Sequence, residues 1–143
     1  GRTVWPEGDD ELLARVYTIR RVDLERDEVA VDVVVHEGAP GSDWATSAEP
    51  GSIVGLLGPG GGGMPPEADH LVLAGDETAL PAIARMLENL PAAASATVRI
   101  EIADTAEEQD LRSAADIDLR WLPRDGAPAG STDLLEKAIR ELD

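Results

Sequence analysis

The sequence contains no cysteine and only two histidines, His36 and His70. The absence of cysteine excludes disulfides, thiolate metal sites and cysteine nucleophiles, and it is consistent with a reducing cytoplasm, where we expect the protein to be located. With two histidines and no thiolate, we expect no transition-metal site. The Gly-x-Ser-x-Gly pattern of α/β-hydrolases is also absent, so nothing in the sequence favours a serine hydrolase.

Basic residues are scarce, because 12 Lys and Arg stand against 29 Asp and Glu, giving a formal net charge of -17. A nucleic acid needs a basic footprint and an anionic membrane would repel this chain, so we expect neither partner. No apolar run reaches the length of a membrane span and no signal peptide is visible, which predicts a soluble protein. With 43% hydrophobic residues in 143, the chain can form one core or two small half-cores.

The most informative segment is 70–83, where an apolar run passes through a tight turn into a helix. Residues 71–74 are typical of a parallel strand that is covered on both faces. We expect Gly75 to permit a sharp exit from this strand. Pro81 lacks an N–H group and fits only in the first helical turn, which places the helix start at about Thr78. Free N–H groups of this turn favour an anion such as phosphate, so the segment is interpreted as a nucleotide-binding turn.

A different pattern precedes this segment. Residues 12–22 and 29–36 alternate as two antiparallel strands joined by a charged turn, and a third strand is expected at 52–57. The glycine-rich and proline-rich run 58–66 cannot form a regular element, so it is the predicted domain boundary. It lacks the Lys-Ser/Thr ending of a phosphate-binding loop and any helix after it, which favours a linker.

Beyond the boundary, strands and helices alternate, which predicts an α/β unit with parallel strands and right-handed crossovers. Nucleotides bind beyond the carboxyl ends of such strands. The expected strands are 71–74, 98–102 and 117–121. The expected helices are 78–90, with Leu80, Ile83, Ala84, Leu87 and Leu90 on one face, a short helix opened by a capping box at 105–108, and a last helix capped by Ser131 or Thr132. We therefore divide the chain into 1–66 and 67–143.

The first candidate for chemistry is the segment 15–20. Alternation places Arg15 and Tyr17 on one strand face, where a guanidinium could hold a phosphate and a phenol could pack on a ring. Thr18 would face the other way unless a bulge turns it, although its backbone amide could still reach a cofactor. From spacing alone, a surface arginine beside a packed tyrosine is the more frequent explanation of this pattern.

The second candidate is the segment 36–45, a strand end followed by a turn and one or two helical turns. Gly41 and Ser42 would open this helix, and their backbone amides could bind a pyrophosphate without a basic side chain. Taken alone, His36 is more typical of a hydrogen-bonded strand-end residue than of a base or a ligand.

Three segments coincide in order and spacing with one known family. The segments Arg15–Thr18, His36–Ala45 and Gly75–Ala82 resemble the siderophore-interacting protein family of ferric-siderophore reductases, which are ferredoxin–NADP reductase-like flavoproteins. The resemblance implies an α/β protein in which a partial antiparallel β-barrel of the FAD-binding type precedes a Rossmann-like parallel half that binds NAD(P)H. Family members are considerably longer, so the chain resembles their central part.

The resemblance also implies an activity and roles for residues. Hydride would pass from NAD(P)H to FAD, and electrons would then reduce iron in a ferric siderophore and release Fe(II). Arg15 would hold the FAD pyrophosphate, Tyr17 would pack on the flavin or its ribityl chain, and Thr18 and His36 would lie near the ring. The pyrophosphate turn and helix would comprise Gly41, Ser42, Trp44 and Ala45, and the nicotinamide nucleotide would meet Gly75, Asp76, Glu77, Thr78, Ala79 and Pro81.

A second function stays open beside the reductase. The chain could be a truncated, non-catalytic module that keeps the fold and binds a nucleotide or flavin. Three strands cannot close a barrel, so the sheet of the first part would expose unpaired edges and an apolar face. Self-association into a homo-oligomer through these edges is therefore expected.

Overall fold

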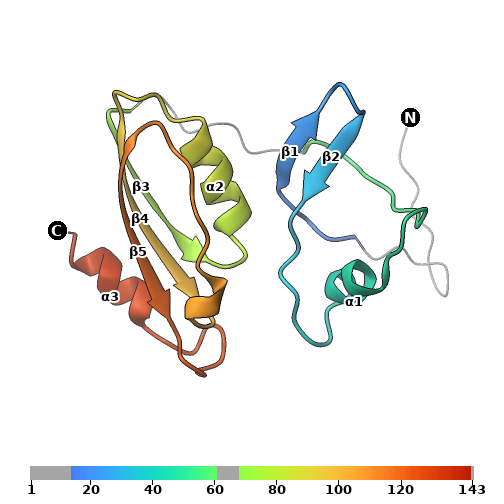
Figure 1. Ribbon diagram of the computed structural model, residues 1–143. Coiled ribbons are helices and arrows are strands. Elements are labelled where there is room, and N and C mark those ends of the chain that lie inside the picture. The colour runs from blue at the N-terminus through green and yellow to red at the C-terminus, as the bar shows by residue number, and fades with distance from the viewer. Residues whose placement is uncertain (1–13, 61–67, 143) are drawn as a thin grey trace.

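The computed structural model describes residues 14–60 and 68–142, which form two separate sheets and three α-helices (Figure 1). One sheet is an antiparallel pair from the first part of the chain, and the other has three parallel strands from the second part. The predicted mixture of antiparallel and parallel sheets is thus confirmed. In the part of the chain that the structure describes, no helix has the length and apolar character that a membrane crossing needs.

The antiparallel pair consists of β1 (Ile19–Asp23) and β2 (Glu28–Val31). Its turn is fixed by Asp23, whose side chain accepts hydrogen bonds from the backbone N–H groups of Glu25 and Arg26 at 3.1 and 3.2 Å. Both strands are shorter than the predicted 12–22 and 29–36. The register shifts between Ile19 and Arg21, and pairing ends at Val31, so residues 14–18 and 32–36 lie outside the ladder.

The chain between β2 and the boundary holds one helix, α1 (Pro40–Ser47), with Ala39 at its N-cap. The prediction of a strand at 52–57 is wrong, because these residues form no ladder and are exposed throughout. An apolar segment becomes a strand only where a neighbouring edge can pair with it, and none of the described segments pairs with these residues. The barrel is accordingly not closed by the described residues.

The second sheet consists of β3 (His70–Asp76), β4 (Ser95–Ile102) and β5 (Asp116–Pro123) in the order β3-β4-β5. Both pairs are parallel, as predicted. The helix α2 (Leu80–Glu88) covers one face and α3 (Leu134–Arg140) lies on the other (Figure 1). Apolar residues of β4 and the predicted stripe of α2 pack into one core that contains Leu71, Leu80, Ile83, Leu87, Leu90, Ala96, Val98, Ile100 and Ile102.

The other face of β4 is polar although it is buried. Thr97, Arg99 and Glu101 are each less than one tenth exposed, and the Arg99 guanidinium pairs with Asp118 of β5 at 2.7 Å. A buried charge is tolerated only when it is paired and hydrogen-bonded. These contacts therefore allow charged side chains on the buried polar face of the central strand.

Four predicted element ends differ from the structure. Gly75 does not end the strand, because it pairs with Ile100 inside β3, and α2 begins at Leu80 rather than at Thr78. The short helix is a 3₁₀ turn, η2 (Thr105–Glu107), which is capped by Asp104 in place of the predicted box that starts at Thr105. Asp133, not Ser131 or Thr132, occupies the N-cap of α3. Of the three N-cap residues, only Asp104 caps through its side chain, which accepts from the N–H of Ala106, whereas Ala79 and Asp133 make no side-chain capping hydrogen bond.

The two sheets are connected through α2. The guanidinium of Arg20 on β1 binds both carboxylate oxygens of Glu88 at the end of α2, at 2.6 and 2.7 Å, and Arg85 donates to the backbone carbonyl of Ile19. The hydrogen bond from Arg20 lowers the pKa of Glu88. The predicted domain boundary between residues 66 and 67 falls within 61–67, which lie outside the described residues. It therefore stays a prediction.

Candidate functional site

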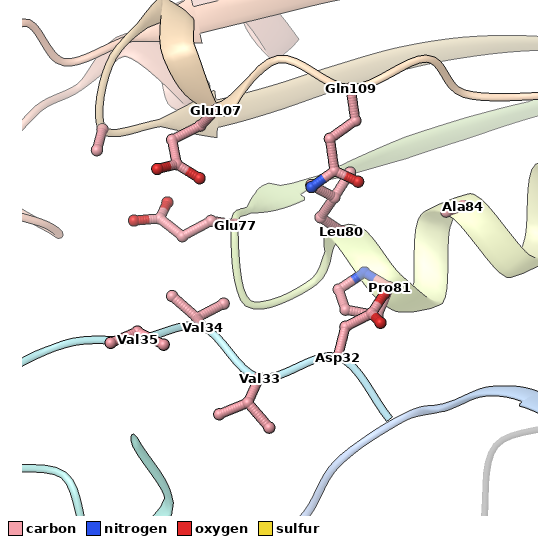
Figure 2. A pocket seen from close by; sticks show the side chains of 11 residues that line it. Asp32, Val33, Val34, Val35, Glu77, Leu80, Pro81, Ala84, Glu107 and Gln109 are labelled. Carbon is pink, nitrogen blue, oxygen red and sulfur yellow. The ribbon is translucent and has the colours of Figure 1, made fainter. Parts of the chain in front are cut away.

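A cleft of about 530 Å³ opens between the two regions at the carboxyl ends of β3 and β4 (Figure 2). Ligands of open parallel sheets bind at this edge. Three segments line it, one after β2, one at the start of α2 and one after β4. The lining residues are Asp32, Val33, Val34, Val35, Glu77, Leu80, Pro81, Ala84, Ala103, Glu107 and Gln109.

The cleft has apolar walls and an acidic interior. Val34 and Pro81 lie on opposite sides, and the carboxylates of Glu77 and Glu107 point toward each other from neighbouring segments (Figure 2). None of the described lining residues is basic. Apolar walls with a few polar groups suit a flat ring, and carboxylates there accept hydrogen bonds from hydroxyl or amide groups of a ligand.

The turn between β3 and α2 is held by its own hydrogen bonds. Asp76 Oδ1 accepts from the backbone N–H of Thr78 at 2.9 Å and from its hydroxyl at 2.5 Å. The N–H of Ala79 bonds the carbonyl of Asp76 at 3.0 Å, and that of Leu80 reaches the carbonyl of Glu77 at 3.4 Å. The expectation that the N–H groups of this turn are free is therefore wrong for these three. The turn provides a fixed shape rather than a row of open donors.

Gly75 has a steric role in this turn. A Cβ atom built on Gly75 would lie 2.5 Å from the Cβ of Ala79, which is closer than two non-bonded carbon atoms can approach. The absence of a side chain on Gly75 lets the chain fold back over the end of β3. Gly75 is thus required by its packing against Ala79 and not by a sharp exit from the strand.

The Glu77 side chain is held by an arginine from the far strand. Arg124, directly after β5, binds both oxygens of Glu77 at 2.5 and 2.8 Å. Arg124 also lies 3.6 Å from Glu101 of β4, whose other oxygen accepts from Thr132 at 2.9 Å. The hydrogen bond from Arg124 lowers the pKa of Glu77, and the same bond raises the pKa of Arg124.

Sequence analysis missed Arg124 and Glu101. A signal for Glu101 was present, because Thr97, Arg99 and Glu101 recur at every second position of an otherwise apolar strand, which marks a polar face. Arg124 gave no comparable signal. Its partner Glu77 lies 47 residues away, and only the parallel topology brings the two together.

The first candidate segment and the second meet at one contact. The hydroxyl of Tyr17 lies so close over Gly41 that a Cβ on Gly41 would collide with it. Arg15 and Tyr17 are exposed, and Thr18 is half-buried. Residues 14–18 belong to no strand, so the predicted strand face is not formed there. The Arg15 side chain donates to the adjacent carbonyl of Ala14 at 2.8 Å.

The second candidate segment is tied to the cleft through Ser42. This residue is buried; its hydroxyl accepts from the backbone N–H of His36 and donates to the carbonyl of Val34, both at 3.1 Å. The Ser42 hydroxyl thus fastens α1 to the segment that lines the cleft. The His36 and Trp44 side chains are exposed and Ala45 is half-buried. Among residues 14–60 and 68–142, no group of three His, Asp or Glu is placed to hold a metal ion.

Two family models match the chain. The model described as siderophore-interacting protein matches residues 68–143, and the model described as siderophore-interacting FAD-binding domain matches residues 1–63.

Individual relatives agree with these matches. The chain is 38% identical over 143 residues to ferric vibriobactin reductase from Vibrio cholerae, covering 99% of the chain and 51% of the relative. It is 34% identical over 127 residues to NADPH-dependent ferric-chelate reductase from Escherichia coli, covering 85% and 49%. The crystal structure of a siderophore utilization protein from T. fusca superimposes with a TM-score of 0.86 at 44% identity, covering 99% of this chain and 57% of that one. The chain thus spans about half the length of these relatives.

Proposed function

Because the chain belongs to the siderophore-interacting protein family, we propose that it is part of a reductase that passes electrons from NAD(P)H through FAD to iron in a ferric siderophore, which is thereby released as Fe(II). The observation that carries this proposal is the cleft at the carboxyl ends of β3 and β4, bounded on its other side by the segment that follows β2. Such a cleft can bring two ring systems together. A non-catalytic module is not favoured, because the relatives are named as reductases.

We propose that the pyridine nucleotide binds over the segment Gly75–Pro81. The support is the fixed turn, the steric need for Gly75 and the position of Leu80 and Pro81 in the cleft wall. The proposed contact residues are Gly75, Asp76, Glu77, Thr78, Ala79 and Pro81. Because several amides of the turn are already bonded, we expect shape and the apolar wall to contribute more to this binding than free N–H groups do.

We propose that FAD lies along the first part of the chain. Arg15 would hold the pyrophosphate, Tyr17 would pack on the flavin or its ribityl chain, and Thr18 and His36 would lie near the ring. The first N–H groups of α1, at Gly41 and Ser42, have no acceptor within the helix and could receive a phosphate oxygen, with Trp44 and Ala45 following. When bound, the flavin supplies the electron transfer, and this chain supplies binding and orientation.

The same proposal includes the organisation and location of the chain. Residues 1–66 would belong to an FAD-binding barrel and 67–143 to the nucleotide domain, in a cytoplasmic protein with a ferric siderophore as substrate. The chain alone would then be a poor enzyme that holds FAD weakly, since the apolar residues 53–57 are exposed.

The test is anaerobic reduction by NADH and by NADPH, with FAD supplied in excess because the chain alone is expected to hold it weakly. Gly75→Val adds a side chain against Ala79 and should slow flavin reduction while the flavin stays bound. Ala74→Val, one position earlier on the exposed side of β3, is the matched control and should leave reduction unchanged. If Gly75→Val is reduced at the normal rate, the nucleotide binds elsewhere. If neither nucleotide reduces the unmodified protein, the proposed function fails.

A further inference from the structure

One arginine connects the ends of all three parallel strands. Arg124 follows β5, Glu101 is near the end of β4 and Glu77 directly follows β3. The Arg124 side chain is only 4% exposed, and those of Glu77 and Glu101 are 17% and 8% exposed. The three ionic groups thus form one cluster under the edge of the sheet where the cleft opens.

This cluster cannot serve as an anion site. Two carboxylates surround one guanidinium, so the cluster carries a net negative charge and would repel a phosphate. Arg124 is therefore not available to a nucleotide directly. Any effect of Arg124 on the cleft has to pass through the groups that it holds.

The contact between Arg124 and Glu77 constrains orientation as well as position. A planar guanidinium that binds both oxygens of a carboxylate fixes the plane of that carboxylate, which a single hydrogen bond would not do. Glu77 is the second residue of the turn Asp76–Ala79, and its carboxylate lines the cleft (Figure 2). The turn is thus held at Asp76 by local hydrogen bonds and at Glu77 from across the sheet.

We propose that Arg124 is a positioning residue for the pyridine nucleotide, which acts by holding Glu77 and, through it, the turn between β3 and α2 in its receiving shape. This inference rests on the proposed function, because it concerns the same nucleotide site. It assigns the Glu77 side chain to support of the turn and leaves contact with the ligand to the backbone and to neighbouring residues.

The experiment measures the dissociation constants of NAD⁺ and NADP⁺, which do not reduce flavin, on the FAD-loaded protein by calorimetry. Glu77→Gln and Arg124→Gln should each weaken binding about tenfold, since a misplacement of about 1 Å in a site can cost up to about a hundredfold. The double variant should be no weaker than Arg124→Gln, because both changes break one contact. Flavin affinity should not change in any of them.

Two control variants separate positioning from stability. Glu101→Gln removes the partner of Arg124 that lies outside the turn, and Arg99→Gln removes the other buried arginine of the sheet, whose partner Asp118 lies away from the cleft. Both should lower the unfolding temperature and leave nucleotide affinity within about twofold of the unmodified protein.

The outcomes are distinct. Unchanged nucleotide affinity in Glu77→Gln overturns the positioning role, and so does an equal loss of affinity in Arg99→Gln. If Arg124→Gln does not fold, Glu77→Gln decides alone, because it keeps the contact between Arg124 and Glu101. If the unmodified protein binds neither nucleotide, the proposed function fails instead.

Discussion

The two regions of the molecule bury their apolar residues very differently. Every buried hydrophobic residue that the structure describes lies in 68–142, whereas Ser42 is the only buried residue of any kind described in 14–60. Most of the exposed large hydrophobic residues belong to the first region, among them Val16, Leu24, Ile53, Leu56 and Leu57.

This difference places the hydrophobic core in the second region and leaves the first dependent on contacts outside its own two strands. The parallel sheet has a helix on each face and a continuous core, so hydrophobic burial can maintain it. The antiparallel pair has two strands, which are marginal in water without further strands or a covering element. Contacts with α2 supplement this pair: Arg20 of β1 binds Glu88, and Arg85 of α2 donates to the carbonyl of Ile19. The Ser42 hydrogen bonds fasten α1 to the chain that follows β2.

The largest expected effect concerns association of the chain. Exposed apolar residues and open strand edges of the first region should drive self-association, which the net charge of -17 opposes. Light scattering should give particles above the monomer mass of 15.1 kDa, and more of them at high salt, where charge repulsion is screened. A monomer at both low and high salt would contradict this expectation.

The cost of truncating an apolar side chain should differ between the regions. Leu87 is fully buried and Ile53 is 92% exposed. Leu87→Ala should lower the free energy of unfolding by about 2–5 kcal/mol, and Ile53→Ala should change it by less than about 0.5 kcal/mol. Denaturant unfolding measures both. Equal costs would show that the first region contributes to the same cooperative core.

The cofactor roles proposed for the first region can be tested at Arg15. Arg15→Ala should weaken FAD binding by about 1.5–3 kcal/mol, as expected for a hydrogen bond to a charged group, and Tyr17→Ala should weaken it too. Arg26→Ala removes another exposed arginine, which pairs with Asp23 at 3.2 Å, and should have no effect. Unchanged flavin titration in Arg15→Ala would remove Arg15 from the site.

The free energy of unfolding should depend on pH mainly through the second region, which contains the Arg124–Glu77 pair. Because Arg124 lowers the pKa of Glu77 in the folded state, this contact stabilises the protein above the ordinary glutamate pKa. That stability is lost as the pH falls below about 4.3 and through the lowered folded value. Glu77→Gln should therefore flatten the acid side of the stability profile. The same acid slope in both proteins would contradict the contact.

The smallest effect is expected where the two regions meet. The Arg20–Glu88 pair is short, but Glu88 is 36% exposed, so solvent screening limits its contribution to at most about 1 kcal/mol. Glu88→Gln should lower the free energy of unfolding by that amount, and less at high salt. Glu141→Gln, which breaks the exposed pair with Arg120 inside one region, is the control. A large loss in Glu88→Gln would mean that this contact maintains the first region.

The second region was predicted well because its signals are local. The apolar spacing of α2 and the parallel strand pairing are confirmed. The expectation that residues 71–74 are covered on both faces is wrong, because Val72 and Ala74 are exposed on one face of β3. The strand predicted at 52–57 failed because pairing needs a partner edge that periodicity does not reveal. The contact between Arg124 and Glu77 could not be predicted, since it depends on how strand ends far apart in sequence meet.

The candidate site shows the same limit. Motif resemblance selected Gly75–Pro81, and the structure places Glu77 and Pro81 in the cleft wall. It did not reveal that the amides of this turn already have acceptors, because these are the Asp76 side chain for Thr78 and backbone carbonyls for Ala79 and Leu80. Contact between Tyr17 and Gly41 also needed coordinates, as these residues belong to separate segments.

The close approach of Gly75 and Ala79 limits which substitutions this sequence can accept at the two positions. Because the two positions share room for a single methyl group, a larger residue at either one should persist in evolution only when the other shrinks. Gly75→Ala should thus be tolerated only together with Ala79→Gly, so the two positions should covary. Across related sequences, the summed size of this pair should stay constant even where each residue varies.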